Sequence, residues 1–264
     1  MLKGKCALLT GSVSGIGFAI AKKLAAGGCD IVLHGLEGAA VAAERQAELE
    51  RDYGVRTSYS DADLRQPERI RDMMRNATDK FGSVDIVINN AVVRHFEAIE
   101  TFPEEKWNDA LAVNLSSTFY TTKHALPGMR KKGYGRIVNI ASTAALRAMP
   151  YRIDYATTKH ALIGMTKVIA LETINSGITC NALCPHSVLT PSSNARIEQL
   201  MARESLPRDK AVKQFLSNRQ PAGRFVDPDK IGGTVVFLCG EDAADISGVA
   251  LPIDIAWMAG FSQD

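Results

Sequence analysis

The chain contains 264 residues, of which 46% are hydrophobic and 23% are charged, with a formal net charge of +2. This balance is typical of a globular protein and excludes a disordered polyelectrolyte. The charge is too small for the extended cationic field that nucleic-acid binding requires, so we expect no nucleic-acid partner. Because the sequence has no run of about 18 apolar residues and no hydrophobic signal segment at its start, we expect a cytoplasmic protein without a membrane partner.

Short apolar runs alternate with longer helical stretches along the whole chain, which is typical of βαβ units. The runs predict strands at 6–10, 30–35, 84–90, 135–142, 178–185 and 249–254, with a further strand before Asp63. The stretches between them predict helices at about 15–28, 39–53, 67–80, 104–131, 155–175 and 228–240. Continuous apolar runs indicate strands that are covered on both faces. We therefore predict an α/β fold for residues 1–264: a single-domain, Rossmann-type doubly wound parallel sheet of about seven strands, with helices on both faces.

Residues 190–224 interrupt this alternation with a long insertion after a strand. The insertion contains two helix-like stretches that separate near Pro207, and it is rich in lysine and arginine. In an open α/β sheet, ligands bind beyond the carboxyl ends of the strands, so an insertion at this place is a candidate helical lid over a substrate. A solvated surface excursion is the alternative.

The five cysteines are odd in number and lie mostly within apolar runs, so we expect buried free thiols, as in a reducing compartment. Cys180 and Cys184 are spaced C-x-x-x-C, but no second pair of Cys or His residues at ligand spacing lies near them in the sequence. We therefore predict no metal site.

The sequence LLTGSVSGIG near the N-terminus ends a strand and opens a helix. Gly11, Gly15 and Gly17 allow a tight turn, a close approach of a pyrophosphate to the backbone and close packing of helix on strand. The amide groups of the helix N-terminus favour an anion, and Ser14 and Ile16 lie in the same turn. The spacing G-x-x-x-G-x-G after a first strand therefore predicts a dinucleotide-binding site.

The tip of the second expected strand, HGLEG, bears on which dinucleotide binds. Glu37 lies about 20 residues after the glycine turn, where an acid that binds the ribose 2'-hydroxyl is expected. Neither Ser14 nor Leu36 offers a positive charge to a 2'-phosphate, so we predict NAD rather than NADP as the cofactor. After the next strand, Asp63 and Leu64 are candidates for the border of the adenine pocket, and a helix cap is an equal alternative for Asp63.

Tyr155 and Lys159 are four residues apart on an expected helix, so both side chains project from one face. Ser142 ends the preceding strand, and Asn114 lies in the middle of an earlier helix. A phenol is a poor base at neutral pH, because its reference pKa is about 10. Lowering that pKa by about 3 units needs roughly 4 kcal/mol of preferential phenolate stabilisation, much of which a neighbouring ammonium can supply. Taken singly, Ser142 could instead cap the strand end, and Asn114 could form a helix-bending hydrogen bond.

With these residues together, the chain resembles the short-chain dehydrogenases/reductases, whose glycine turn is TGxxxGxG and whose active site combines Asn, Ser and Tyr-x-x-x-Lys. The resemblance spans nearly the whole chain and implies a catalytic tetrad of Asn114, Ser142, Tyr155 and Lys159. By this resemblance, Tyr155 would take the proton of the substrate hydroxyl while a hydride passes to the nicotinamide, and Ser142 would hold the substrate oxygen. Lys159 would bind the ribose and lower the pKa of the tyrosine, and Asn114 would support a water-mediated proton path.

Further cofactor contacts follow from the same resemblance through the motifs NNA and CP and the segment after them. They are Asn90, Ala91, Pro185, Val188 and Thr190, in addition to Tyr155 and Lys159. The family also implies a homotetramer, built through the expected helices at about 104–131 and 155–175.

Within this family, the scaffold sequences VDIVINNA, GRIVNIAS and GMTKVIALET are most similar to bacterial D-3-hydroxybutyrate dehydrogenases. The positions that are Gln, His, Trp and Gln in that subgroup's substrate pocket are here Arg94, Ala144, Ser187 and Arg196. These exchanges predict a larger and more cationic pocket, in which guanidinium groups bind an anionic substrate through paired hydrogen bonds. A surface arginine paired with a nearby glutamate is the alternative for each of them. The predicted substrate-binding residues are Arg94, Ser142, Arg152, Arg196 and Trp257.

Three positions depart from glycines that the family usually has: Val92 in NNAG, His186 in PG, and Ile255-Ala256 in DGG. A β-branched side chain at such a position is expected to demand a local adjustment of the backbone. Cofactor affinity and subunit packing are therefore open at this point, and we treat His186 as a loop residue.

Three hypotheses about function follow. The first is an NAD-dependent oxidoreductase that interconverts a secondary alcohol and a ketone on a small anionic substrate, with D-3-hydroxybutyrate as the best candidate. The second is a dehydrogenase for a larger hydroxy compound with a carboxylate or sulfonate, favoured by the arginines. The third is an NAD-binding sensor or scaffold with weak catalysis, suggested by the lost glycines and opposed by the intact tetrad.

Overall fold

A computed structural model describes residues 2–217, 220 and 222–260 of the chain. Within these residues, seven parallel strands form one sheet in the order β3-β2-β1-β4-β5-β6-β7. The chain crosses from one half of the sheet to the other between β1 and β4, as in doubly wound sheets, which confirms the predicted α/β fold. The strands are β1 (Cys6–Leu9), β2 (Asp30–His34), β3 (Thr57–Ser60), β4 (Ile86–Asn89), β5 (Gly135–Ile140), β6 (Ile178–Pro185) and β7 (Ala250–Ile253).

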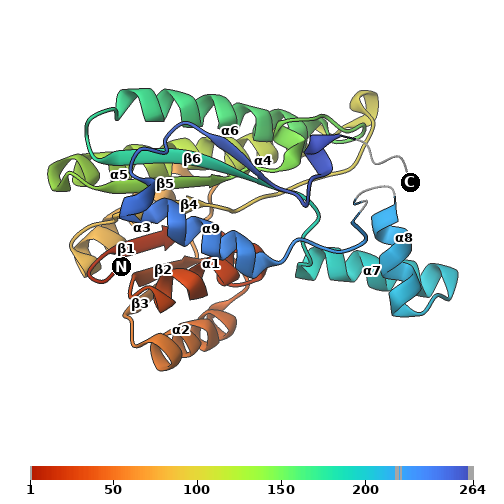
Figure 1. The fold of residues 1–264 in the computed structure, drawn as a ribbon, viewed down its shortest axis with the longest axis horizontal. Helices are drawn as coiled ribbons and strands as arrows, with labels where there is room; N and C mark the ends of the chain where they lie inside the picture. Colours follow the sequence, from red (N-terminus) through yellow and green to blue (C-terminus); the bar gives the residue numbers. More distant parts are fainter. Residues whose placement is uncertain (1, 218–219, 221, 261–264) are drawn as a thin grey trace.

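Helices cover both faces of the sheet (Figure 1). On one face, Leu24 and Leu238 from two helices pack with strand residues such as Ile31; on the other, Ile70 and Met129 pack with Ile137 and its neighbours. The central strands are buried along their whole length because both of their faces are covered, which explains their continuous apolar sequences. The first layer contains α1 (Gly15–Ala26), α2 (Ala39–Tyr53) and α9 (Pro228–Cys239), and the second contains α3 (Pro67–Phe81), α4 (Glu104–Ala110), α5 (Ser117–Lys132) and α6 (Ile153–Glu172).

The predicted single helix at 104–131 is wrong in its middle. The segment consists of α4, a π-helical stretch called η2 (Leu111–Ser116), and α5. The π stretch contains Asn114, whose side chain binds the backbone of a neighbouring loop. Single π-helical turns inside α-helices are frequent at functional sites. Short 3₁₀ turns occur at η1 (Ile99–Thr101), η3 (Thr143–Ala145), η4 (Glu241–Ala243) and η5 (Trp257–Ala259).

The insertion at 190–224 forms two helices, α7 (Pro191–Glu204) and α8 (Arg208–Ser217). The break between them lies at Pro207 and the two residues before it, as predicted. Its residues 218, 219 and 221 lie outside the described part of the chain. Thr190 caps α7, because its side chain accepts from the Ser193 amide at 3.3 Å while the Ser193 hydroxyl accepts from the Thr190 amide at 2.7 Å. Both helices project beyond the carboxyl ends of the strands (Figure 1), which is the expected place for a lid.

All five cysteines are buried and free, as predicted. Among the described residues, no helix has the length and apolar character needed to cross a lipid bilayer. Within the same residues, no group of three or more His, Cys, Asp and Glu side chains could hold a metal ion.

Candidate active site

A cavity of about 500 Å³ lies at the carboxyl ends of the strands and gathers most of the predicted site residues. Pockets of this size and position are typical of ligand-binding sites in open α/β sheets. Five predicted residues are not among those that line it: Gly17, Leu36, Asp63, Leu64 and Asn114. The predicted residues that do line it are Gly11, Ser14, Gly15, Ile16, Asn90, Ala91, Arg94, Ser142, Arg152, Tyr155, Lys159, Pro185, Val188, Thr190, Arg196 and Trp257.

The glycine turn forms one end of the cavity. Gly11 and Gly15 have φ values of 60° and 55°, a left-handed conformation that favours glycine. A β-carbon on Gly17 would meet the carbonyl oxygen of Gly11, so this glycine is required for close packing and not for contact with a ligand. Helix α1 has neither a side-chain cap nor an acidic residue in its first turn, and its first two residues face the cavity. The turn is therefore arranged as an anion-binding helix N-terminus.

The side chains of Asn90, which is partly buried, and His34, which is buried, hold the glycine turn in place. The amide group of Asn90 donates to the carbonyl oxygens of Thr10 and Gly11 at 3.0 and 2.6 Å. His34 accepts from the Gly11 amide through Nδ1 at 3.0 Å, and its Nε2 is 2.8 Å from the carbonyl oxygen of Ala62. Because Nδ1 accepts, Nε2 must carry the hydrogen of a neutral ring, and burial lowers the pKa of His34. Through these hydrogen bonds, Asn90 and His34 fix the backbone conformation of the glycine turn.

Glu37 lines the cavity at the tip of β2. Its carboxylate accepts from the Leu36 amide at 2.8 Å and from the Ser14 hydroxyl at 3.4 Å. Leu36 itself is exposed. An acidic group thus stands beside the glycine turn, at the distance along the chain that the sequence predicted.

Asp63 and Leu64 lie outside the cavity lining. The Asp63 carboxylate accepts from the Arg65 guanidinium at 2.7 Å and from the Arg65 amide at 3.0 Å. The hydrogen bond from Arg65 holds the pKa of Asp63 below its usual range. Leu64 belongs to the hydrophobic core under α3. In this structure both residues are engaged with their own segment.

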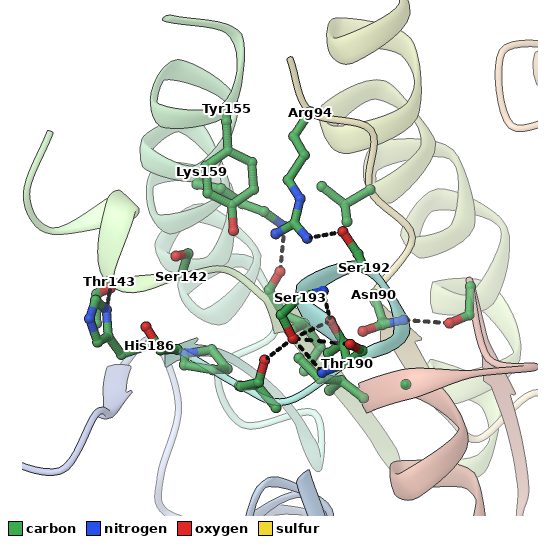
Figure 2. A pocket seen from close by; sticks show the side chains of 18 of the residues that line it. Asn90, Arg94, Ser142, Thr143, Tyr155, Lys159, His186, Thr190, Ser192 and Ser193 are labelled. Carbon is green, nitrogen blue, oxygen red and sulfur yellow. Dashed lines mark hydrogen bonds between the residues drawn. The ribbon is translucent and has the colours of Figure 1, made fainter. Parts of the chain in front are cut away.

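Ser142, Tyr155 and Lys159 meet in the cavity, where their side chains converge from the end of β5 and from α6 (Figure 2). The Ser142 hydroxyl accepts from the Ala144 amide at 3.1 Å, which fixes its oxygen at the end of the strand. Lys159 is 3% exposed, and its Nζ donates to the Ile140 carbonyl oxygen at 2.6 Å. The same Nζ lies 5.8 Å from the centre of the Tyr155 ring. One strand end and one helical turn thus bring the three predicted residues together.

Burial lowers the pKa of Lys159 to about 7. Of the nearby groups, Cys184 acts in the opposite direction and raises this pKa, and the positive charge of Arg94, a smaller effect, lowers it. An ammonium group is strongly hydrated in water, and one carbonyl oxygen replaces only part of that hydration. Without a ligand, Lys159 is therefore only partly protonated at neutral pH, which reduces the charge it can offer to the tyrosine.

Asn114 lies behind the cavity, in the π-helical stretch η2. Its side chain holds both backbone groups of Val93: Oδ1 accepts from the amide at 2.8 Å, and Nδ2 donates to the carbonyl oxygen at 2.9 Å. Nδ2 also lies 3.2 Å from the hydroxyl of Thr158 on α6. Asn114 therefore connects the loop after β4 with α6, and it is not among the residues that line the cavity.

The three predicted arginines all line the cavity. Arg94 donates to the Ser192 hydroxyl on α7 at 2.9 Å (Figure 2). The Arg152 guanidinium lies over the rings of Phe96 and Tyr155, and that of Arg196 lies over Phe215. Such stacking orients a guanidinium group over an aromatic ring.

His186 is the functional candidate that the sequence interpretation missed. It lies in the loop directly after β6, as expected, and it also lines the cavity and stacks on Trp257 with ring centres 4.3 Å apart and planes 14° apart. Its Nδ1 is 2.8 Å from the hydroxyl of Thr143 (Figure 2). Arg147 lies over the same tryptophan ring. The departure from glycine at this position was the available signal.

Comparisons with known proteins place the chain in a family. A family profile described as enoyl-(acyl carrier protein) reductase matches residues 11–256. The D-beta-hydroxybutyrate dehydrogenase of Cupriavidus necator is 44% identical over 259 residues, which cover 98% of this chain and 100% of that protein. This chain belongs to the short-chain dehydrogenase/reductase family. A protein of the same name from Rhizobium meliloti is 39% identical over 255 residues, covering 97% of this chain and 99% of that protein.

A solved structure of this family agrees with the fold. L-sorbose reductase from Gluconobacter frateurii, complexed with NADPH and L-sorbose, matches with a TM-score of 0.94 and 30% identity, covering 98% of each chain. As a short-chain dehydrogenase/reductase, the protein is an oxidoreductase that acts on hydroxyl or keto groups, as predicted. Its family binds a nicotinamide coenzyme.

The departures from the glycines of short-chain dehydrogenases/reductases have different structural outcomes. Ile255 and Ala256 have φ values of 54° and 62°, so the turn before Trp257 keeps a left-handed backbone without glycine. A β-branched residue in this region is rare, and such conformations cost about 1–3 kcal/mol each. Val92 and His186 are not among the described residues with positive φ, so their side chains bring no comparable strain.

Proposed function

We propose that this enzyme is an NAD-dependent dehydrogenase that interconverts a secondary alcohol and a ketone on an acidic substrate. The observation that carries the proposal is that one cavity joins Ser142 and Tyr155 to three arginine side chains. D-3-hydroxybutyrate is the first candidate substrate, because the two curated relatives described above bear the name of its dehydrogenase.

The residues present fit a nicotinamide coenzyme. The uncapped N-terminus of α1, with its left-handed glycines, opens into the cavity and suits a pyrophosphate. We assign Gly11, Ser14, Gly15 and Ile16 to the pyrophosphate end, and Lys159 to the ribose next to the nicotinamide. The bound coenzyme accepts or supplies the hydride. Further residues assigned to coenzyme binding are Asn90, Ala91, Tyr155, Pro185, Val188 and Thr190.

Glu37 supports NAD over NADP. Its carboxylate lies beside Ser14 and the Leu36 amide, where it can accept from a ribose hydroxyl and would repel a 2'-phosphate. We expect kcat/KM to favour NAD by about a hundredfold or more, and Glu37→Ala to reduce that ratio at least about tenfold. Steady-state kinetics with both coenzymes measures the ratio. A wild-type preference for NADP, the coenzyme that accompanies the L-sorbose reductase structure, would contradict this part of the proposal.

The chain's own residues would handle the proton. The Tyr155 hydroxyl takes the proton from the substrate alcohol, and the Ser142 hydroxyl holds the same substrate oxygen. Protonated Lys159 stabilises the phenolate. Ribose hydroxyl groups around its Nζ would replace the hydration that burial removes, and would thereby favour the protonated form. We assign Asn114 to the proton path through its place in the π-helical stretch.

The arginines support an acidic substrate. Arg94, Arg152 and Arg196 line the same cavity as the reacting groups, where they can bind a carboxylate or sulfonate. A cavity of about 500 Å³ with Met149 and Phe225 on its wall also favours the alternative of a larger anionic hydroxy compound. Turnover of D-3-hydroxybutyrate and of longer hydroxy acids and hydroxysulfonates separates the two candidates.

The anion clamp is tested by Arg152→Met and Arg196→Met. We expect KM for anionic substrates to rise at least about tenfold, and KM for neutral secondary alcohols to change less than about twofold. Arg203→Met is the matched control, because Arg203 lies on α7 as Arg196 does, and it pairs with Glu204 at 2.7 Å. Equal effects on charged and neutral substrates would contradict the clamp. Tight NAD binding without turnover of any substrate would contradict the dehydrogenase and favour the sensor hypothesis.

We also propose the homotetramer that the family implies. Large apolar side chains are exposed on the outer surface of α5 and α6, at Phe119, Val168 and Leu171. Others are exposed at Phe237 on α9 and Leu251 on β7. Two separate apolar faces suit an assembly with two kinds of interface. Light scattering in solution measures the mass, and a monomer would contradict this proposal.

A further inference from the structure

The loop after β4 is fastened on both sides of Arg94. On one side, the side chain of Asn114 binds both backbone groups of Val93. On the other side, Asp154 accepts from the His95 amide at 3.0 Å and from Nδ1 of the His95 ring at 3.0 Å. The residue between these anchors is the arginine that enters the cavity.

Asp154 is fully buried and lies in the first turn of α6, next to Tyr155. Its Oδ1 accepts from the Tyr155 amide at 2.6 Å, and its Oδ2 accepts both hydrogen bonds from His95. Because a carboxylate only accepts, Nδ1 of His95 carries its hydrogen.

Support of the helix start requires only one of the two oxygens. Helix α6 has no side-chain cap at Arg152, so the bond to the Tyr155 amide satisfies one of the free N–H groups there. The other oxygen is directed at the loop. Burial of a carboxylate is unfavourable unless its oxygens are hydrogen-bonded. The bonds from His95 therefore help to offset the cost of burying Asp154.

The contacts form a continuous line from α6 to α7. Asp154 holds Tyr155 and His95, and His95 adjoins Arg94, which donates to the Ser192 hydroxyl at 2.9 Å. Figure 2 shows Tyr155 and Arg94 entering the same cavity from α6 and from the loop after β4. The effect of Arg94 on the pKa of Lys159 agrees with this closeness.

We infer that Asp154 is a positioning residue that, through His95, fixes the Arg94 guanidinium relative to the Tyr155 hydroxyl. One carboxylate would then fix the positions of both Arg94, which binds the acidic group of the substrate, and Tyr155, which takes the proton. A misplacement of about 1 Å far from the reacting atoms can be costly, so such a constraint has a functional value. The inference rests on the proposed acidic substrate.

The kinetic test compares Asp154→Asn and His95→Phe with wild type, using D-3-hydroxybutyrate and NAD, or the best acid of the panel. In Asp154→Asn, the amide nitrogen would face two donors of His95, so the loop loses its anchor while the Tyr155 amide keeps an acceptor. We expect both variants to raise KM for the acid at least about tenfold, with kcat within about threefold and KM for NAD unchanged.

Two further variants separate positioning from stability. His95→Asn places an amide donor near the position of Nδ1, and we expect its KM for the acid to stay within about threefold of wild type. Asp85→Asn is the matched control, because Asp85 is also buried and accepts from Cys6, Ser83 and Lys132 at the amino ends of the strands, away from the cavity. It should be less stable than wild type with an unchanged KM. An unchanged KM in Asp154→Asn would overturn the inference.

A second measurement does not depend on turnover. Hydrogen exchange of the segment 91–98 should be at least about tenfold faster at the His95 amide in Asp154→Asn, and unchanged in Asp85→Asn. If wild type oxidises none of the acids, the proposed function fails, and this measurement alone decides whether Asp154 fixes the loop. Unchanged exchange in Asp154→Asn would overturn the inference whatever the substrate.

Discussion

The two ends of the cavity are built from different parts of the fold. At the reacting end, Ser142 and Lys159 are buried, and each is held by a backbone group: Ser142 by the Ala144 amide and Lys159 by the Ile140 carbonyl oxygen of β5. At the far end, Arg196 comes from the insertion, where its guanidinium lies over Phe215. His186 and Trp257 come from the segments after β6 and β7, and their rings stack on each other. The first end is part of the core, whereas the second is assembled from segments outside it.

This difference separates the chemistry of the enzyme from its choice of substrate. A side chain fixed by a helix and a strand keeps its geometry when loops change, which suits a proton transfer. Loops and insertions tolerate substitution, so changes in them can alter which substrate binds without disturbing the sheet. Changes at the reacting end should therefore abolish turnover or shift stability, and changes at the far end should alter substrate binding and leave the proton transfer intact.

The largest effect is expected at the reacting end, from Tyr155→Phe. Removal of the general base should lower kcat by a factor of about 10² or more, because Tyr155 is the group to which we assign the proton transfer. Steady-state kinetics with saturating NAD and substrate measures the loss. Tyr151→Phe is the control, because Tyr151 is 54% exposed and its substitution should leave kcat unchanged. A loss of less than twofold in Tyr155→Phe would show that the base is assigned wrongly.

A second effect concerns the pH dependence of stability without coenzyme. The folded protein holds the pKa of Lys159 at about 7, below the value of an unfolded lysine. Above pH 7 the unfolded chain therefore binds more protons than the folded one, and stability increases with pH until the unfolded lysine also titrates. Between pH 7 and 9 this contribution is about 2 kcal/mol.

Lys159→Met should remove that increase. Denaturant unfolding at pH 7 and 9 gives the free energy for each variant, and the difference between wild type and Lys159→Met isolates this one side chain from other titrating groups. Lys131→Met, at an exposed lysine of α5, should behave as wild type. A difference that does not change with pH would contradict the buried, partly neutral lysine.

The smallest effect is expected at the far end, from Ala256→Gly. Relief of the left-handed alanine is worth about 1 kcal/mol, and the greater freedom of an unfolded glycine offsets part of it. We expect the free energy of unfolding to rise by about 0.5 kcal/mol and turnover to stay within about twofold. Ala259→Gly, in the next turn without positive φ, should instead be destabilising. A large loss of turnover in Ala256→Gly would break the contrast between the two ends.

The sequence by itself determined the α/β fold, the family and the composition of the reacting end. Short continuous apolar runs are typical of parallel strands covered on both faces, and glycine spacing and a four-residue separation on a helix are local features that survive folding. For this reason the strands and helices agree closely with their predicted ranges, and Gly11, Ser142, Tyr155 and Lys159 all line one cavity.

Only the tertiary structure decided how distant segments contact one another. The π-helical stretch at Asn114, the stacking of His186 on Trp257 and the anchoring of His95 by Asp154 join residues far apart in the sequence. Periodicity reports which face of an element is buried, but it carries no information about which loop lies against that face. The lowered pKa of Lys159 likewise results from burial, because desolvation depends on every segment packed around the charge.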